Sequence, residues 1–405
     1  MGLKNFVEIQ NKTLVKTLKQ SSKTVFYKRK FKENNIDIGK IKTVEDLHRL
    51  PFTAREDLAC SNEDFLAVNK DKIATFFSTS GTTGKRIVSY LSYKDLERGI
   101  GNRIDGFKSY GLRKGSVVLN SRPHGLSSFF LFDVALMKMG MFVIRCGSGL
   151  ETPTTFQLKL IDQFKPNILT AFPSYALRLA EEAEKSGMLD KIKFEKIHLS
   201  GEQFDKKQIE NKFEGAEIFR SYGFNESAAL TSPECREHVG YHVISKDLIF
   251  EVIDTKTDEN ISEGKGQLVI TFFSEAMPLI RYKIGDIANF IPYYECECGL
   301  KTPLIEDIIG RVDKWTKIKG NLVESMAMIE FLKNYHFDDF LIVVRKNEIL
   351  MDELIIKIRT KKFGVKEQVV RDIKENFNIT PIVEFVEEFP MMRKKVYFID
   401  ERAVS

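Results

Sequence analysis

A regular alternation of short apolar runs with helix-patterned stretches fills the middle of the chain and constrains its fold more than any other feature. Stretches such as residues 175–185 have the spacing of a helix with one apolar face. The apolar runs that they separate are residues 117–119, 142–144, 168–171, 197–199 and 218–219. Short buried strands that alternate with helices are typical of parallel sheets covered by helices. The pattern therefore predicts an α/β fold with a parallel sheet.

Other patterns flank this region. About 70 N-terminal residues carry helix signals, and closely spaced strands from residue 248 predict a β-rich subdomain. Ser/Thr-x-x-acid capping boxes predict helix starts at Thr43–Asp46, Thr53–Glu56 and Ser92–Asp95. The last part of the chain reads as a helix at 326–334, strands at 340–345 and 353–359, a helix at 366–377 and a strand at 382–385. We expect a large domain over residues 1–313 and a small α+β domain over residues 314–405.

Composition indicates a globular protein. Hydrophobic residues make up 43% of the chain and aromatic residues 11%, which excludes a disordered or fibrous protein. The net charge is only +5, too small to indicate nucleic acid or an anionic membrane as a partner. The N-terminal stretch lacks the apolar core of a signal peptide, and Phe6 stands where a myristoylation signal has Ser or Thr. We expect a cytoplasmic protein that binds neither nucleic acid nor membrane.

Hydroxyl and glycine residues interleave in a short segment that ends in a lysine. The segment is Ser78, Thr79, Ser80, Gly81, Thr82, Thr83, Gly84 and Lys85. Glycines allow backbone N–H groups to approach an anion, hydroxyls donate to phosphate oxygens, and lysine neutralises charge. A Ser/Gly linker is the alternative, but linkers rarely lie between two strands. The spacing also differs from a Walker A loop, so the segment predicts a phosphate-binding loop outside the P-loop NTPase class.

Three of the five cysteines form a second group with a histidine. Cys235 and His242 precede the strand-rich region, and Cys296 and Cys298 follow most of it. Thiolates and an imidazole suit tetrahedral Zn²⁺, and four protein ligands would make the site structural. Unliganded reduced cysteines are one alternative. His238 is an alternative ligand to His242.

Several segments, in order, resemble the signatures of the adenylate-forming (ANL) superfamily. After the phosphate loop these are Ser200-Gly201-Glu202, Tyr222-Gly223-Phe224-Asn225-Glu226, Arg281 to Asp286, Gly310-Arg311-Val312-Asp313-Lys314, and Arg393-Lys394-Lys395. The stretches 50–53, 173–176 and 275–280 are similar to the phenylacetate–coenzyme A ligase branch. Asn225 and Arg393 depart from the family's usual threonine and glycine. Several ordered matches are stronger evidence than one glycine-rich loop.

The resemblance implies a large adenylate-forming domain and a small mobile cap hinged at Lys314. It implies an enzyme that activates a carboxylic acid, aromatic in the branch it resembles, with ATP and then transfers the acyl group to the thiol of coenzyme A. A carrier-protein phosphopantetheine, a protein side chain or another acceptor stays open as the recipient, and so does a catalytically silent nucleotide-binding homologue. The identity of the acid and the oligomeric state are also open, a homodimer included.

The resemblance also implies roles for single residues. Nucleotide contacts fall to the phosphate loop and to Gly201, Glu202, Tyr222, Gly223, Asp286 and Arg311. Glu226 would hold Mg²⁺, and Lys394, or else Lys395, would stabilise the adenylation transition state. His124, Ser128 and Tyr175 are candidates for the acid pocket, with core packing as the alternative. In isolation Glu226 could also be a helix cap, Asp286 a turn residue and Lys394 a solvated charge.

Overall fold

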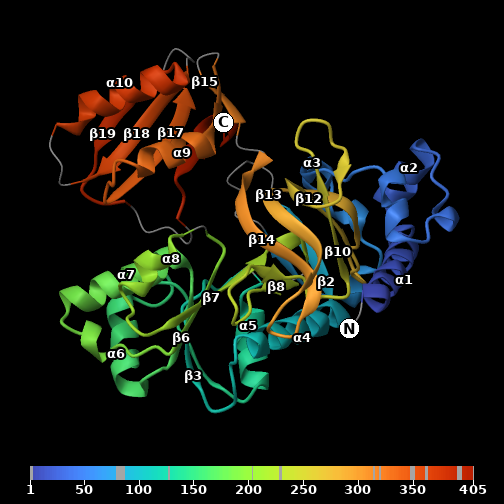
Figure 1. Ribbon diagram of the computed structural model, residues 1–405, viewed down its shortest axis with the longest axis horizontal. Coiled ribbons are helices and arrows are strands. Elements are labelled where there is room, and N and C mark those ends of the chain that lie inside the picture. The colour runs from blue at the N-terminus through green and yellow to red at the C-terminus, as the bar shows by residue number, and fades with distance from the viewer. Residues whose placement is uncertain are drawn as a thin grey trace. The chain divides into compact units, whose positions relative to one another are not determined.

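The structure, a computed structural model, divides the chain into two compact units (Figure 1). The first comprises the described residues up to Ile309, and the second comprises those from Gly310 onward. The described residues are 3–78, 87–125, 128–202, 204–227, 230–312, 315–318, 321–346, 352–360, 364–389 and 395–404. None of the helices in these ranges has both the length and the apolar character that a membrane crossing requires.

A six-stranded sheet in the order β4-β3-β5-β6-β7-β8 forms the centre of the first unit. Its strands are β3 (Val117–Asn120), β4 (Phe142–Arg145), β5 (Ile168–Ala171), β6 (Lys196–Ser200), β7 (Glu217–Gly223) and β8 (Thr231–Pro233). The strands β3 to β7 pair with one another in parallel, and β8 pairs with β7 in the antiparallel direction. The predicted parallel sheet is therefore confirmed, with each strand at its expected place in the sequence.

Helices cover both faces of this sheet (Figure 1). The helices are α4 (Tyr93–Ser109), α5 (Phe130–Lys138), α6 (Thr154–Phe164), α7 (Pro173–Lys185) and α8 (Lys206–Glu210). Leu119 packs with α6 and α7, whereas its neighbour Val118 packs with α4 and α5. Successive side chains of a strand point to opposite faces, so both must be apolar when both faces are covered. This double burial is the reason that the strands appear in the sequence as uninterrupted apolar runs.

A second sheet, in the order β11-β10-β12-β13-β14-β9, confirms the predicted β-rich subdomain. Its strands are β9 (Tyr241–His242), β10 (Leu248–Ile253), β11 (Asn260–Ile261), β12 (Gly264–Phe272), β13 (Leu279–Glu295) and β14 (Lys301–Arg311). The N-terminal helix α1 (Leu3–Ser21) packs its apolar face against this sheet through Leu14 and Leu18. The amphipathic start of the chain is thus part of the subdomain's core.

Short elements complete the first unit. They are the helices α2 (Val25–Glu33) and α3 (Arg55–Cys60), the hairpin strands β1 (Ile73–Ser78) and β2 (Val88–Ser92), and 3₁₀ helices at Ile38–Lys40, Val44–Arg49, Asn62–Phe65, Lys70–Lys72, Leu189–Lys191 and Asn225–Ser227. The capping boxes at Thr43 and Ser92 are confirmed, and the latter begins α4.

The capping box predicted at Thr53 is wrong. Helix α3 is capped one residue later, where the backbone N–H of Ala54 donates to Asp57 at 2.9 Å. Thr53 is instead buried, and its hydroxyl donates to the carbonyl of Ile280 at 2.7 Å. Its backbone N–H also donates to the carbonyl of Arg281, so Thr53 attaches the N-terminal segment to β13.

Arg281 is the second anchor between the N-terminal segment and β13. Its guanidinium forms an ion pair with Glu251 at 3.0 Å and donates to the carbonyl of Leu50 at 2.9 Å. It also lies 4.0 Å from the ring centroid of Phe52. Arg281 has a φ of +43°, an uncommon value for a residue with a side chain, and these contacts hold it there.

The second unit has a four-stranded sheet in the order β19-β18-β17-β20 and two helices. Its elements are β15 (Trp315–Ile318), β16 (Asn321–Glu324), α9 (Ser325–Lys333), β17 (Asp339–Lys346), β18 (Asp352–Arg359), α10 (Val365–Phe377), β19 (Ile382–Phe385), β20 (Phe398–Asp400) and a 3₁₀ helix at Glu401–Val404. Every predicted element of the α+β module is present. The sequence did not indicate the β15–β16 hairpin or β20.

Candidate active site and metal centre

Two tyrosine–carboxylate hydrogen bonds join the end of β7 to β13 in a crosswise arrangement. The Tyr222 hydroxyl, on β7, donates to Asp286 of β13 at 2.6 Å. The Tyr282 hydroxyl, on β13, donates to Glu226 just after β7 at 3.0 Å. Each segment thus contributes a tyrosine and, four residues later, a carboxylate. Both carboxylates are buried, Glu226 with 6% exposure and Asp286 with 8%, so the cross-links position charged groups next to a parallel-strand end.

Glu226 has a geometry that suits a hard cation. Both of its observed partners act on Oε1, since Arg55 of α3 forms an ion pair with the same oxygen at 3.2 Å. Among the described residues Oε2 has no hydrogen-bond partner, so this oxygen is open to a ligand. Carboxylate oxygen is the ligand that Mg²⁺ prefers. The neighbouring Asn225 donates to the carbonyl of Ser78 at 3.2 Å, which places the last residue of β1 beside this segment.

The remaining predicted nucleotide residues fall into two groups. Arg311 ends β14 and belongs to the second unit, so its predicted nucleotide contact stays a prediction. Of the other predicted residues, Thr79, Ser80, Gly81, Thr82, Thr83, Gly84, Lys85, Lys314 and Lys394 lie outside the described residues.

Gly201 and Glu202 form the turn after β6. Gly201 has a φ of +88°, and a Cβ there would lie 2.7 Å from Phe172, so the turn requires glycine. The Glu202 carboxylate accepts hydrogen bonds from the backbone and the hydroxyl of Ser174, both at 2.9 Å. These bonds attach the turn to the first residues of α7. The predicted nucleotide contact of Glu202 is separate from this contact and stays a prediction.

A pocket opens at the carboxyl ends of β6 and β7. Its lining includes Gly201, Gly223, Asn225, Ser128, Phe129, Phe132 and Arg103. The carboxyl ends of parallel strands are the usual place for a ligand in open α/β sheets. Ser128, a candidate for the acid pocket, is among the lining residues, and its contact with the acid stays a prediction.

His124 and Tyr175, the other two predicted pocket residues, are not among the lining residues. Tyr175 is buried in the core, where its hydroxyl lies 3.3 Å from that of Thr154. The backbone N–H of His124 donates to Glu151 at 3.1 Å.

His198 of β6 is buried close to this pocket. Its Nε2 lies 2.9 Å from the hydroxyl of Ser221 and 3.3 Å from that of Tyr110. Burial, followed by the charges of Arg122 and Arg103, lowers the pKa of His198 well below its usual value. The imidazole is therefore neutral in the folded protein at neutral and mildly acidic pH.

This neutral histidine predicts acid sensitivity of the fold. In the unfolded chain His198 takes up a proton below about pH 6.5, whereas the folded protein does not, so acid favours unfolding. We expect the free energy of unfolding to fall by about 2 kcal/mol more between pH 7.5 and pH 5 in the wild type than in His198→Gln. Urea unfolding of both proteins at the two pH values measures this difference. Equal losses in both would contradict the prediction.

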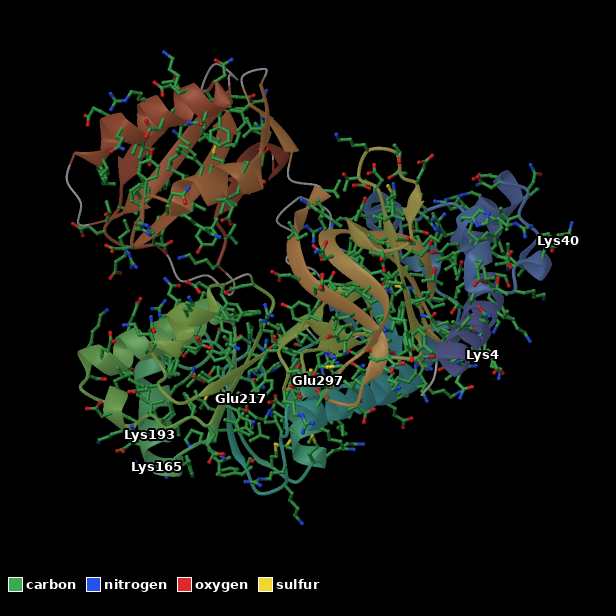
Figure 2. All side chains as sticks on the ribbon, in the orientation of Figure 1. Lys4, Lys40, Lys165, Lys193, Glu217 and Glu297 are labelled. Atoms are coloured by element: carbon green, nitrogen blue, oxygen red, sulfur yellow. The ribbon has the colours of Figure 1, made fainter. Side chains whose placement is uncertain are left out.

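Four potential metal ligands of the first unit come together from the segment after β8, from β9 and from the turn after β13. The ligand atoms of Cys235, His242, Cys296 and Cys298 all lie within 4.8 Å of one another. Glu297, labelled in Figure 2, marks the turn between β13 and β14 that holds two of these cysteines.

The donor atoms of this cluster fit a zinc ion. The Nδ1 of His242 is 3.0 Å from the hydroxyl of Thr302, and its buried Nε2 has no hydrogen-bond partner among the described residues. Zinc-bound histidines use one nitrogen for the metal and the other for such a hydrogen bond. Burial raises the pKa of Cys235 to about 12, so its thiol would ionise near neutral pH only with a cation beside it. His238 lies elsewhere, with Glu234 at 3.2 Å and Glu217, labelled in Figure 2, at 3.6 Å.

Comparison with known proteins agrees with this fold. No protein-family model matches the chain. A phenylacetate-coenzyme A ligase of Thermus thermophilus is 30% identical over 394 residues, which cover 88% of this chain and 86% of that protein. One of Aromatoleum evansii is 28% identical over 390 residues, covering 91% and 87%. The fold also matches a crystal structure of 2-hydroxyisobutyryl-CoA ligase in the postadenylation state, with a TM-score of 0.83 and 20% identity. This match covers 100% of this chain and 91% of the other.

The fold is shared with a 2-hydroxyisobutyryl-CoA ligase, so the chain has the fold of an acid–coenzyme A ligase. Structural likeness at 20% identity shows the fold alone, whereas the Thermus thermophilus relative shows the family. The chain belongs to the phenylacetate–coenzyme A ligase family.

Proposed function

We propose that the protein is an AMP-forming acid–thiol ligase whose acceptor is coenzyme A. A carboxylate oxygen of the acid attacks the α-phosphate of ATP, the bond to the β-phosphate breaks, and pyrophosphate leaves. The thiolate of coenzyme A then attacks the acyl carbon, and AMP leaves with the electrons of the acyl–oxygen bond. The observation that carries the proposal is the crosswise pair of Tyr–carboxylate bonds, which joins Asp286 and Glu226 to the segment at the end of β7 whose residues Gly223 and Asn225 line the pocket.

The two carboxylates have separate roles in this proposal. Asp286 accepts hydrogen bonds from the ribose hydroxyls, since one carboxylate can accept from both. Tyr222 orients Asp286 for that contact through its own bond of 2.6 Å. Glu226 would hold Mg²⁺ through the open Oε2, and the ion would supply positive charge to the triphosphate. The hydroxyl-rich segment from Ser78 to Lys85 would bind phosphate oxygens.

Zinc would be bound by Cys235, His242, Cys296 and Cys298 and would stabilise the β-rich subdomain without a part in acyl transfer. The small domain would begin at Lys314 and move as a cap between the two half-reactions, and the division of the structure at Ile309 supports a joint in this region. We place the protein in the cytoplasm. A carrier protein is the alternative acceptor to coenzyme A, and product analysis would identify it. Mass analysis of the native protein would identify a homodimer.

ATP–pyrophosphate exchange with a panel of carboxylic acids tests the proposal. We expect exchange to depend on the acid, and mass spectrometry to detect an acyl–coenzyme A product only when coenzyme A is present. Transfer to a carrier protein but not to coenzyme A would replace the acceptor. ATP binding without exchange for any acid would overturn the enzyme assignment in favour of a catalytically silent homologue.

The role of Asp286 predicts a specific loss of ATP affinity. Asp286→Ala removes two charged hydrogen bonds to the ribose, worth roughly 1.5–3 kcal/mol each, so ATP affinity should fall at least roughly tenfold. Tyr222→Phe is the matched control, because it keeps the carboxylate and removes only its positioning bond, and its loss should be smaller. Calorimetric titration with ATP measures both. Unchanged affinity in a folded Asp286→Ala protein would refute the assignment.

A further inference from the structure

The inner wall of the pocket contains a buried cation that the proposed reaction does not use. Arg103 lies on α4 with only 2% exposure, yet its side chain lines the pocket. One guanidinium nitrogen donates to the carbonyl of Gly99 at 3.2 Å, and another donates to the hydroxyl of Ser128 at 3.2 Å. Ser128 also lines the pocket, so a charged donor and a hydroxyl share one wall.

A second buried cation reinforces the first. Arg122 has 0% exposure, and its guanidinium carbon and that of Arg103 each lie 4.8 Å from the ring centroid of Phe132. Arg122 donates to the hydroxyl of Ser200, another lining residue, at 2.8 Å, and forms no ion pair within the described residues. Two guanidinium groups thus lie against one phenylalanine ring of the pocket lining.

Both cations keep their protons at neutral pH. Burial and the charge of Arg122 lower the pKa of Arg103 to about 9. Burial lowers the pKa of Arg122 to about 9 as well, although Tyr110 and Glu202 offset part of that decrease. An anion bound in the pocket would stabilise both charged forms.

The rest of the lining is suited to the body of a small acid. Phe129, Phe224 and Leu230 contribute apolar surface to the same lining. An oxygen anion beside Arg103 and Ser128 would accept charge-assisted hydrogen bonds, which a wholly apolar tail cannot accept.

We infer that the acid activated by this protein carries a second anionic group, such as a carboxylate, which Arg103 and Ser128 bind at the inner end of the pocket. This inference rests on the proposed acid activation and specifies its substrate class. Arg103 is then a specificity-determining residue, because a site built to bind a charged group discriminates strongly against analogues that lack it.

Matched acids test the inference. We would compare phenylacetate with 4-(carboxymethyl)benzoate and butyrate with glutarate, using 4-hydroxyphenylacetate as the uncharged polar analogue. In pyrophosphate exchange the wild type should prefer each dicarboxylate by roughly 10²-fold or more in kcat/KM. Arg103→Met keeps the apolar stem and removes the charge, so it should lose this preference while activity on the monocarboxylates stays equal or rises. Arg103→Lys should restore part of it, and Arg113→Met, at an exposed arginine, should change nothing.

Several results would overturn the inference. One is a wild type that uses the monocarboxylates as well as the dicarboxylates, and another is an unchanged preference in Arg103→Met. A third is an Arg103→Met protein with the wild-type Tm and ATP affinity whose kcat/KM falls equally for monocarboxylates and dicarboxylates, because Arg103 would then act on the reacting carboxylate. If no acid supports exchange, the proposed function fails, but calorimetric binding of the dicarboxylates to wild type and Arg103→Met still decides the inference.

Discussion

Lys394→Ala should abolish ATP–pyrophosphate exchange, with a loss of roughly 10²–10³-fold or more, and should leave the thiol step intact. The expected cause is loss of the ammonium that meets the charge developing between the carboxylate and the α-phosphate. Lys395, the alternative, has other contacts within the second unit. Its ammonium pairs with Asp339 at 2.5 Å and lies 5.1 Å from the ring centroid of Tyr397. These contacts favour Lys394 for the catalytic role.

Three variants separate the half-reactions. Lys394→Ala, given chemically made acyl-adenylate, should form thioester at nearly the wild-type rate. Lys314→Pro fixes φ at the proposed hinge and should slow thioester formation while exchange continues. Lys395→Ala should retain exchange. Full exchange in Lys394→Ala together with its loss in Lys395→Ala would move the role to Lys395, and full exchange in both would refute the proposed mechanism of this segment.

Cys296→Ser should release zinc and destabilise the first unit. We expect about one zinc per chain in the wild type, and much less in the variant, because serine does not replace a thiolate ligand. The free energy of unfolding should fall by roughly 4–5 kcal/mol or more, the range in which loss of a metal site places a point mutation. Elemental analysis and denaturant unfolding measure the two effects.

Cys60→Ser is the matched control for the metal site, because Cys60 is exposed and lies outside the cluster. It should keep both zinc and stability. A wild-type protein without metal, in which Cys235, Cys296 and Cys298 all react with a thiol reagent in the native state, would refute the site.

Local patterns predicted the secondary structure well where burial was uniform. The strands β3, β5, β6 and β7 lie inside the sheet and are largely buried, so each produced a continuous apolar run that the sequence displays directly. Thr53 shows where such reasoning fails. It satisfies the pattern of a capping box, but its hydroxyl bonds to Ile280, 227 positions away, and no local pattern encodes that partner.

The candidate site was predicted only in part, because some of its contacts join residues that are far apart in the sequence. Glu226, Asp286 and Tyr222 stood out by resemblance, whereas the crosswise role of Tyr282 required two distant strands to meet. Arg103 was missed because a charged residue on a helix is usually solvent-exposed. A signal was nevertheless present, since Arg103 shares the helical spacing of Gly99, Gly106 and Phe107, which form the buried face of α4.

The attachment of the N-terminal segment to β13 also determines when the nucleotide site can form during synthesis. Leu50 and Arg281 are separated by 231 positions, so the first segment leaves the ribosome long before its partner exists. At typical elongation rates this interval is roughly 12–46 seconds. Throughout it Tyr27, Thr53 and their apolar neighbours lack the strand that buries them in the finished protein. Tyr282 and Asp286 therefore complete the site only after most of the first unit has been translated.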